Sequence, residues 1–236
     1  MSGQRPLRVL LVDDQSLIRM GFRLVLEGAD IEVVGEAADG AEGVALAQQI
    51  KPDVVLMDVR MPVMDGIEAT RQITETTDAR VIILTTFDVD EYAFAGLRAG
   101  ASAFMLKDAR PEELIYAVEV VRAGESIVAP RMTARLVEEF VNGSPADKYN
   151  SRNIYKKQLS MLTPREKDTV QAIAEGLSNS EIAERFFVSE TTVKTHVRSI
   201  LSKLHLRDRV QVVVFAYESA MVQPGHRESF GSGAEK

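Results

Sequence analysis

Three aspartates follow apolar runs in the N-terminal half of the chain, at points where buried strands would end. Asp13 and Asp14 come directly after the run 7–12, and Asp58 comes directly after the run 53–57. Parallel strands keep their direction, so the carboxyl ends of these two strands would meet at one edge of a sheet. Oxygen ligands with an open side suit Mg²⁺, which also accepts phosphate oxygens. The spacing therefore predicts a magnesium-binding cluster in which one carboxylate acts as a nucleophile toward a phosphoryl group.

The elements that must position these carboxylates alternate between strand and helix. Runs rich in Val, Ile and Leu predict five strands, at 7–12, 31–36, 53–57, 80–85 and 102–106. Helical periodicity lies between and after them, near 15–27, 40–50, 66–75, 90–98 and 111–122. Strict alternation of this kind predicts an α/β fold with a doubly wound, five-stranded parallel sheet.

The first predicted helix has an apolar face that we expect to lie against the sheet, formed by Leu17, Ile18, Phe22, Leu24 and Val25. Other aspartates in this half have a more ordinary explanation. Asp39 and Asp65 stand directly before helical patterns and are expected to cap those helices rather than to bind a ligand.

The alternation stops after residue 124, and the remaining chain is helical. A short helix is predicted at 130–140, and the polar, turn-rich stretch 142–153 is typical of a linker. Four further helices are predicted near 164–175, 179–186, 190–204 and 208–219. We therefore expect one domain at 7–124, a connecting helix and linker at 125–161, a second domain at 162–222 and a disordered tail at 223–236.

Composition excludes several classes of protein. The 236 residues include no Cys, which excludes disulfides and thiolate metal sites and is compatible with a reducing cytoplasm. No apolar signal region opens the chain, and no apolar run is long enough for a transmembrane helix. The net charge is −7, but residues 152–218 carry 11 basic and 8 acidic side chains, a net of +3. This asymmetry is compatible with a module that binds a polyanion joined to an acidic one, and equally with ordinary surface scatter.

Residues 7–122 resemble the receiver domain of response regulators, through Asp13-Asp14, Asp58, the loop Met61-Pro62 to Asp65-Gly66, Thr85 and Lys107. The resemblance implies that Asp58 accepts a phosphoryl group from a sensor histidine kinase. It also implies that Mg²⁺ is bound by Asp13, Asp14, Asp58 and the backbone carbonyl of Arg60. Thr85 would bond the phosphoryl oxygen, Lys107 would supply the counter-charge, and Phe104 would be the aromatic that turns inward as Thr85 moves.

Residues 162–219 resemble the LuxR-type helix-turn-helix of the NarL/FixJ response regulators. The stretches that carry this resemblance are 162–166, 175–183 and 188–196. The helix near 190–204 would enter the major groove of double-stranded DNA, with an apolar stripe inward and Thr191, Lys194, Thr195, Arg198 and Lys203 outward. The implied contacts to bases or their surroundings come from Lys194, Thr195 and Arg198, and those to phosphates or the turn from Thr192 and His196. An alternative is a solvated amphipathic face with no ligand.

The last predicted helix has more apolar residues than one face needs: Val210, Val212, Val213, Val214, Phe215 and Ala216. Two explanations remain open, a homodimer contact and burial in the core of its own domain. Dimerisation would predict binding to paired half-sites about 10 bp apart.

Together these features predict a cytoplasmic two-component response regulator that controls transcription. Such a protein catalyses only its own phosphorylation and dephosphorylation and is otherwise not an enzyme. A phosphatase with an aspartyl-phosphate intermediate is a second hypothesis, but it would need an acid two residues after Asp58, where Arg60 stands. A third is a DNA-binding regulator that works independently of phosphorylation. The intact set of receiver residues argues against that hypothesis.

Overall fold

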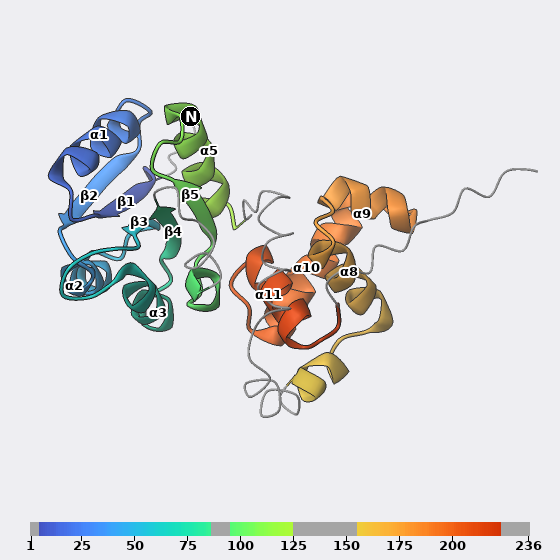
Figure 1. Cartoon of the computed structure of the whole chain (residues 1–236). Coiled ribbons are helices and arrows are strands. Elements are labelled where there is room, and N and C mark those ends of the chain that lie inside the picture. Colours follow the sequence, from blue (N-terminus) through green and yellow to red (C-terminus); the bar gives the residue numbers. More distant parts are fainter. Residues whose placement is uncertain (1–4, 86–94, 125–154, 223–236) are drawn as a thin grey trace, which may run out of the picture.

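A computed structural model of the chain describes residues 5–85, 95–124 and 155–222 (Figure 1). It contains an α/β domain followed by a helical domain. The α/β domain comprises β1 (Arg8–Val12), α1 (Ser16–Glu27), β2 (Glu32–Ala37), α2 (Gly40–Ile50), β3 (Val54–Asp58), α3 (Gly66–Thr76), β4 (Arg80–Thr85), β5 (Ala103–Leu106) and α5 (Pro111–Arg122). The helical domain comprises α8 (Pro164–Ala174), α9 (Asn179–Phe186), α10 (Glu190–Leu204) and α11 (Arg209–Glu218).

Five parallel strands form one sheet in the order β2-β1-β3-β4-β5, which confirms the predicted fold class. Each strand lies within two residues of its predicted bounds. Because the order steps outward from β1 in both directions, the connecting helices cover both faces of the sheet. Figure 1 shows α1 and α5 on one face, and α2 and α3 on the other.

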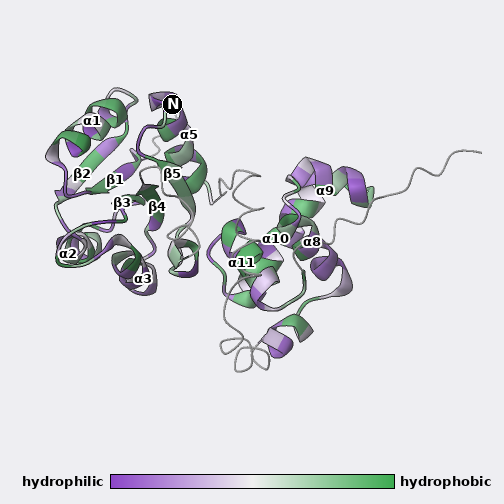
Figure 2. Ribbon diagram, in the orientation of Figure 1, coloured by the Kyte–Doolittle hydropathy of each residue, from purple (hydrophilic) through white to green (hydrophobic). Residues whose placement is uncertain are grey.

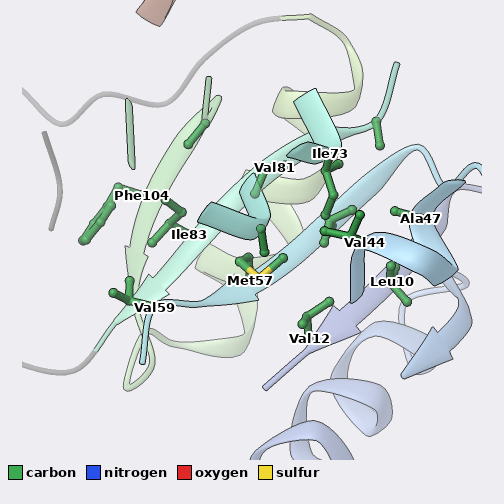
Figure 3. Packing of buried hydrophobic residues seen from close by; sticks show 14 of the residues in the cluster. Leu10, Val12, Val44, Ala47, Met57, Val59, Ile73, Val81, Ile83 and Phe104 are labelled. Carbon is green, nitrogen blue, oxygen red and sulfur yellow. The ribbon is translucent and has the colours of Figure 1, made fainter. Parts of the chain in front are cut away.

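Each face of the sheet has its own apolar core. The strand residues that face α2 and α3, such as Leu10, Met57 and Ile83, are fully buried in a cluster with Val44 and Ile73 (Figure 3). The opposite cluster joins the other strand residues to α1 and α5. The strands are consequently apolar on both sides, which explains their almost unbroken runs of Val, Ile and Leu (Figure 2).

Helix starts in the α/β domain follow the capping chemistry expected from the sequence. The Asp39 carboxylate accepts a hydrogen bond from the Glu42 amide, and that of Asp65 accepts hydrogen bonds from Ile67 and Glu68. Both aspartates are therefore N-caps, as predicted.

The predicted inner face of α1 is wrong in two positions. Phe22 and Val25 pack against the core, but the side chains of Leu17 and Leu24 are 79% and 67% exposed. Leu26 is the one residue of α1 that is fully buried. The helix has apolar residues around much of its circumference, so periodicity alone did not identify the face that meets the sheet.

The helical domain matches the four predicted helices to within one residue at each end. A third apolar cluster holds these helices together, with Val170, Ile182, Val193, Ile200 and Phe215 among its buried members. None of the helices in the described ranges combines the length and apolar character that a bilayer crossing requires. The predicted helix at 130–140, the linker at 142–153 and the tail from 223 fall outside the described residues.

The apolar residues of α11 divide between two cores. Val212, Val213, Phe215 and Ala216 belong to the core of the helical domain, as one of the two hypotheses expected. The two remaining residues, at positions 210 and 214, are buried in the α2–α3 core of the other domain. The excess apolar surface of α11 is therefore covered by the α/β domain within the same chain, an arrangement that neither hypothesis included.

Candidate functional site

The three predicted carboxylates meet at the carboxyl edge of the sheet. β1 and β3 are neighbours, with Val12 opposite Met57, so the residues that follow them lie side by side. Asp13, Asp14 and Asp58 each offer a carboxylate oxygen, and these oxygens lie within 4.8 Å of one another. Asp13 and Asp58 are buried, whereas Asp14 is exposed. The cluster is thus open to solvent on one side only.

Lys107 supplies the positive charge of this cluster. Its Nζ lies 2.7 Å from Asp13 Oδ2 and 2.9 Å from Asp58 Oδ2, and all three side chains are at most 7% exposed. The Lys107 amide also donates a hydrogen bond of 2.7 Å to the Thr85 carbonyl, which ties the end of β5 to the end of β4. The backbone pairing of β4 with β5 therefore positions Lys107 so that its ammonium lies between the two carboxylates.

The electrostatics of the cluster are set by burial and by this ammonium. Burial raises the pKa of Asp58 above its ordinary value, and the nearby Lys107 only partly opposes the shift. Burial alone would lower the pKa of Lys107, but its contacts with Asp13 and Asp58 outweigh burial, so that this pKa is raised. One lysine therefore does not fully compensate the buried negative charge.

The donor set fits a hard divalent cation. All ligand atoms are oxygens, and Asp14 leaves an exposed side where water or a phosphate oxygen can bind. Although Lys107 is near, Asp13 Oδ2 is buried and has no well-directed hydrogen bond among the described residues. A buried carboxylate oxygen with unused hydrogen-bonding capacity is a suitable metal ligand.

Gly66 fixes the backbone around Asp58. Its amide donates a hydrogen bond of 2.8 Å to the Val59 carbonyl. A Cβ atom at position 66 would lie 1.9 Å from the carbonyl oxygen of Asp58, a distance that no side chain tolerates. Only glycine lets the loop return this closely to β3, which explains the Asp65-Gly66 pair noted in the sequence.

The two predicted switch residues lie on adjacent strands. Thr85 ends β4, is 6% exposed and pairs in register with Leu106. Phe104, on β5, is 9% exposed and belongs to the α2–α3 core (Figure 3). The same apolar cluster includes Val210 and Val214 of α11.

The second candidate site is the outer face of α10. Ser189 caps this helix, accepting a hydrogen bond from the Thr192 amide, and α9 precedes it at a tight turn in which Phe187 has a left-handed backbone. Val193, Ile200 and Leu204 face the core, as predicted. The predicted DNA-contacting residues that are exposed are Thr191, Lys194, Thr195 and Arg198; Thr192 and His196 are half-buried.

Lys203 does not belong to this exposed face, contrary to the prediction. Its Nζ contacts Glu166 at the start of α8, 2.6 Å and 2.8 Å from the two carboxylate oxygens. Ser199 of α10 also donates a hydrogen bond to this carboxylate, at 2.7 Å. Glu166 also forms a capping box with Thr163 at the start of α8. The sequence analysis did not predict its contact with α10, because local spacing carries no signal for a contact between separate helices.

Comparisons with known proteins find matches for both domains of the chain. A family model described as the response regulator receiver domain matches residues 9–119, and one described as bacterial regulatory proteins of the luxR family matches residues 160–216. The uncharacterized transcriptional regulatory protein YxjL of Bacillus subtilis (strain 168) is 46% identical over 220 residues, covering 92% of this chain and 98% of the relative. The transcriptional regulatory protein LiaR of the same organism is 42% identical over 222 residues, covering 92% and 99%.

A solved structure gives the same picture. A two-component response regulator of the LuxR family from Aurantimonas sp. SI85-9A1 is 37% identical, with a TM-score of 0.53, and covers 58% of this chain and 99% of its own. The family matches fall on the segments that hold the carboxylate cluster and α10.

Proposed function

Since this chain belongs to the response regulators that join a receiver domain to a LuxR-type DNA-binding domain, we propose that phosphorylation of Asp58 controls how its helical domain binds promoter DNA. The chain is a two-component response regulator that controls transcription. The observation that supports Asp58 as the acceptor is the convergence of three carboxylates and one lysine at the sheet edge. The proposed receiver is 7–124, the connection 125–161 and the DNA-binding domain 162–222, and the cell compartment is the cytoplasm.

In this proposal each residue of the cluster has one task. Asp58 attacks the phosphorus of a phosphoryl group donated by a sensor histidine kinase, and the bond from phosphorus to the donor breaks. Asp13, Asp14 and the Arg60 carbonyl would hold Mg²⁺ together with Asp58, and the ion when bound neutralises charge on the transferred group. Lys107 contributes a second positive charge, at the position where it now contacts Asp58.

Phosphorylation adds about −1.5 to −2 charge to a site whose negative charge is already only partly compensated. Thr85 would donate a hydrogen bond to the new phosphoryl oxygen, and Phe104 would turn inward as Thr85 moves. Since Phe104 packs near α11, this motion alters the contact between the receiver and the helical domain. A change in that contact would make the helical domain available for paired half-sites, as a homodimer.

Replacing Asp58 with Asn tests the acceptor. Wild-type protein incubated with a small acyl phosphate and Mg²⁺ is expected to gain the mass of one phosphoryl group, because in this proposal Asp58 is the acceptor and the other carboxylates of the cluster hold the metal. The Asp58→Asn variant is expected to gain none. Intact-protein mass spectrometry measures both, with a chelator as the control for metal dependence. An adduct on the Asn variant, or none on wild type, would contradict the assignment.

The proposed DNA surface consists of the exposed residues of α10, chiefly Lys194, Thr195 and Arg198, supported by Thr191, Thr192 and His196. Replacing Arg198 with Ala is expected to lower promoter affinity about tenfold and to reduce the slope of log affinity against log salt by about 1, because one cationic contact is lost. Fluorescence anisotropy at several salt concentrations measures this. Arg122→Ala removes an exposed arginine from the receiver and is expected to change neither quantity. If the two variants bind DNA equally well, Arg198 does not contact DNA.

A further inference from the structure

The start of α11 makes a polar contact with the receiver that the proposed function does not explain. Figure 1 shows α11 on the side of the helical domain that faces the receiver. The contact consists of Arg207, Asp208, Val210 and Gln211 of the helical domain and Arg80 at the start of β4, together with backbone carbonyls of the receiver. We call this set the α11 interface.

Two side chains of the α11 interface donate hydrogen bonds to backbone carbonyls at the ends of receiver helices. Arg207 donates hydrogen bonds of 3.0 Å and 2.8 Å to the carbonyls of Thr74 and Thr77, at the C-terminus of α3. Gln211 Nε2 donates one of 2.9 Å to the Leu97 carbonyl, near the end of the helical stretch 95–98. Carbonyls at a helix C-terminus lack partners within the helix and carry partial negative charge, so a guanidinium there is favourable.

Asp208 has a less favourable position. It is fully buried, and its Oδ1 accepts hydrogen bonds from the amides of Val210 and Gln211, which caps α11. Its Oδ2 has no hydrogen-bond partner among the described residues. Arg80 Nη1 lies 3.7 Å from this oxygen, and the same atom donates a hydrogen bond to the Arg207 carbonyl. Across the domain boundary this buried carboxylate is therefore met by one longer ion pair, to Arg80, and by the Ser102 side chain, which also favours its charged form.

Burial acts against the charged form of Asp208. Desolvation raises the pKa of this carboxyl, and Ser102, the two capping amides and Arg80 oppose the shift without cancelling it. A buried charge that loses its partner costs more than the pair itself contributes. The closed arrangement of the two domains is therefore sensitive to Arg80.

We propose that Arg80 and Asp208 form the charge pair that keeps the unphosphorylated protein closed, with Val210 and Val214 of α11 covered by the receiver. This inference deepens the proposed function, on which it rests, by naming the contact that phosphorylation must overcome. Because the ion pair with Arg80 does not fully compensate the burial of the Asp208 charge, the closed state is stable enough to form but can be opened. A modest change near Phe104, which packs in the same cluster as the two valines, is then sufficient to open it.

The test measures domain closure directly and uses no phosphodonor. The chain has no Cys, so cysteines introduced at the exposed positions Glu75 and Gln171 give two unique labels, one in each domain. Pulsed electron spin resonance then reports the distribution of distances in full-length protein. Arg80→Ala is expected to raise the ratio of open to closed molecules tenfold or more, because Asp208 remains buried without its partner. Arg71→Ala, which removes an arginine that pairs only within α3 among the described contacts, is the matched control and is expected to leave the ratio unchanged.

A second substitution separates the charge pair from a general loss of structure. Asp208→Asn keeps an N-cap for α11 but removes the buried charge. The double variant Arg80→Ala, Asp208→Asn is therefore expected to return to the closed distance, and Asp208→Asn alone to stay closed. Three results would each overturn the proposal. They are a double variant that is as open as Arg80→Ala, an Arg80→Ala protein that is no more open than the control, and a wild-type protein that is already open. A wild type that takes no phosphoryl group would instead refute the acceptor assignment and would leave these distances unchanged.

Discussion

Replacing Lys107 with Ala is expected to lower the free energy of unfolding by about 3–5 kcal/mol in the absence of Mg²⁺, because two buried carboxylates lose the one cation that pairs with them in the described part of the chain. The ion pairs join Lys107 to Asp13 and Asp58, whose side chains are 2% and 7% exposed, so solvent cannot replace the ammonium. Denaturant unfolding of wild type and variant, each with and without Mg²⁺, measures the effect. Because the metal would bind the same oxygens, Mg²⁺ is expected to restore more stability to the variant than to wild type.

The pH dependence of the Lys107 variant has a definite sign. Burial already raises the pKa of Asp58 above its ordinary value in the folded protein, and loss of the ammonium raises it further. Since the folded-state pKa then exceeds the unfolded one, the variant gains stability as the pH falls through the raised pKa toward the ordinary value, and loses it as the pH rises through the same interval.

A surface substitution in the same domain provides the control for Lys107. Arg71→Ala removes an exposed ion pair with Glu68 and is expected to change stability only slightly, since water solvates both groups. If Lys107→Ala is as stable as this control at neutral pH, the lysine does not compensate the carboxylates.

Much of the candidate phosphorylation site was predictable because local pattern and topology suffice for it. Apolar runs locate the strands, and parallel crossovers bring the strand ends together, so Asp13, Asp14 and Asp58 meet wherever the sheet forms. The α/β order leaves little choice in which side chains occupy that edge. Thr85, the last residue of β4, and Lys107, which follows β5, were assigned through the resemblance to receiver domains, and the structure places both at the same edge of the sheet.

Contacts between elements that are distant in sequence were not predictable in the same way. Periodicity describes how one helix repeats, but it does not say what lies opposite each face. For that reason Leu17 was grouped with the apolar face of α1, although its side chain is 79% exposed, and the contact of the half-buried Lys203 with Glu166 was not predicted. The split of the α11 valines between two cores, and the burial of Asp208 against Arg80, likewise depend on how the domains pack.

Replacing Glu166 with Ala is expected to cost about 3 kcal/mol of unfolding free energy in the helical domain at neutral pH, as its pKa shift implies. Burial would raise the pKa of Glu166, but hydrogen bonds from Lys203, Ser199 and Thr163 outweigh burial and lower it to about 2, from an ordinary 4.5. The side chain is 5% exposed and accepts hydrogen bonds from two residues of α10. Its loss frees α10 from α8, so promoter affinity is expected to fall together with stability.

The pH profile and a matched glutamate identify the cause of this loss. A carboxyl with a depressed pKa in the folded state stabilises fully above its ordinary pKa, and that contribution disappears as the pH falls from about 4.5 toward about 2. The gap in stability between wild type and Glu166→Ala should therefore close over this interval in urea unfolding. Glu181 occupies the same capping-box position in α9 but is exposed and bonds only locally, to Ser178. Glu181→Ala is expected to cost much less and to leave α10 in place. If the two substitutions lower the free energy of unfolding equally, Glu166 stabilises the domain through its cap on α8 and not through its link to the proposed DNA-binding helix.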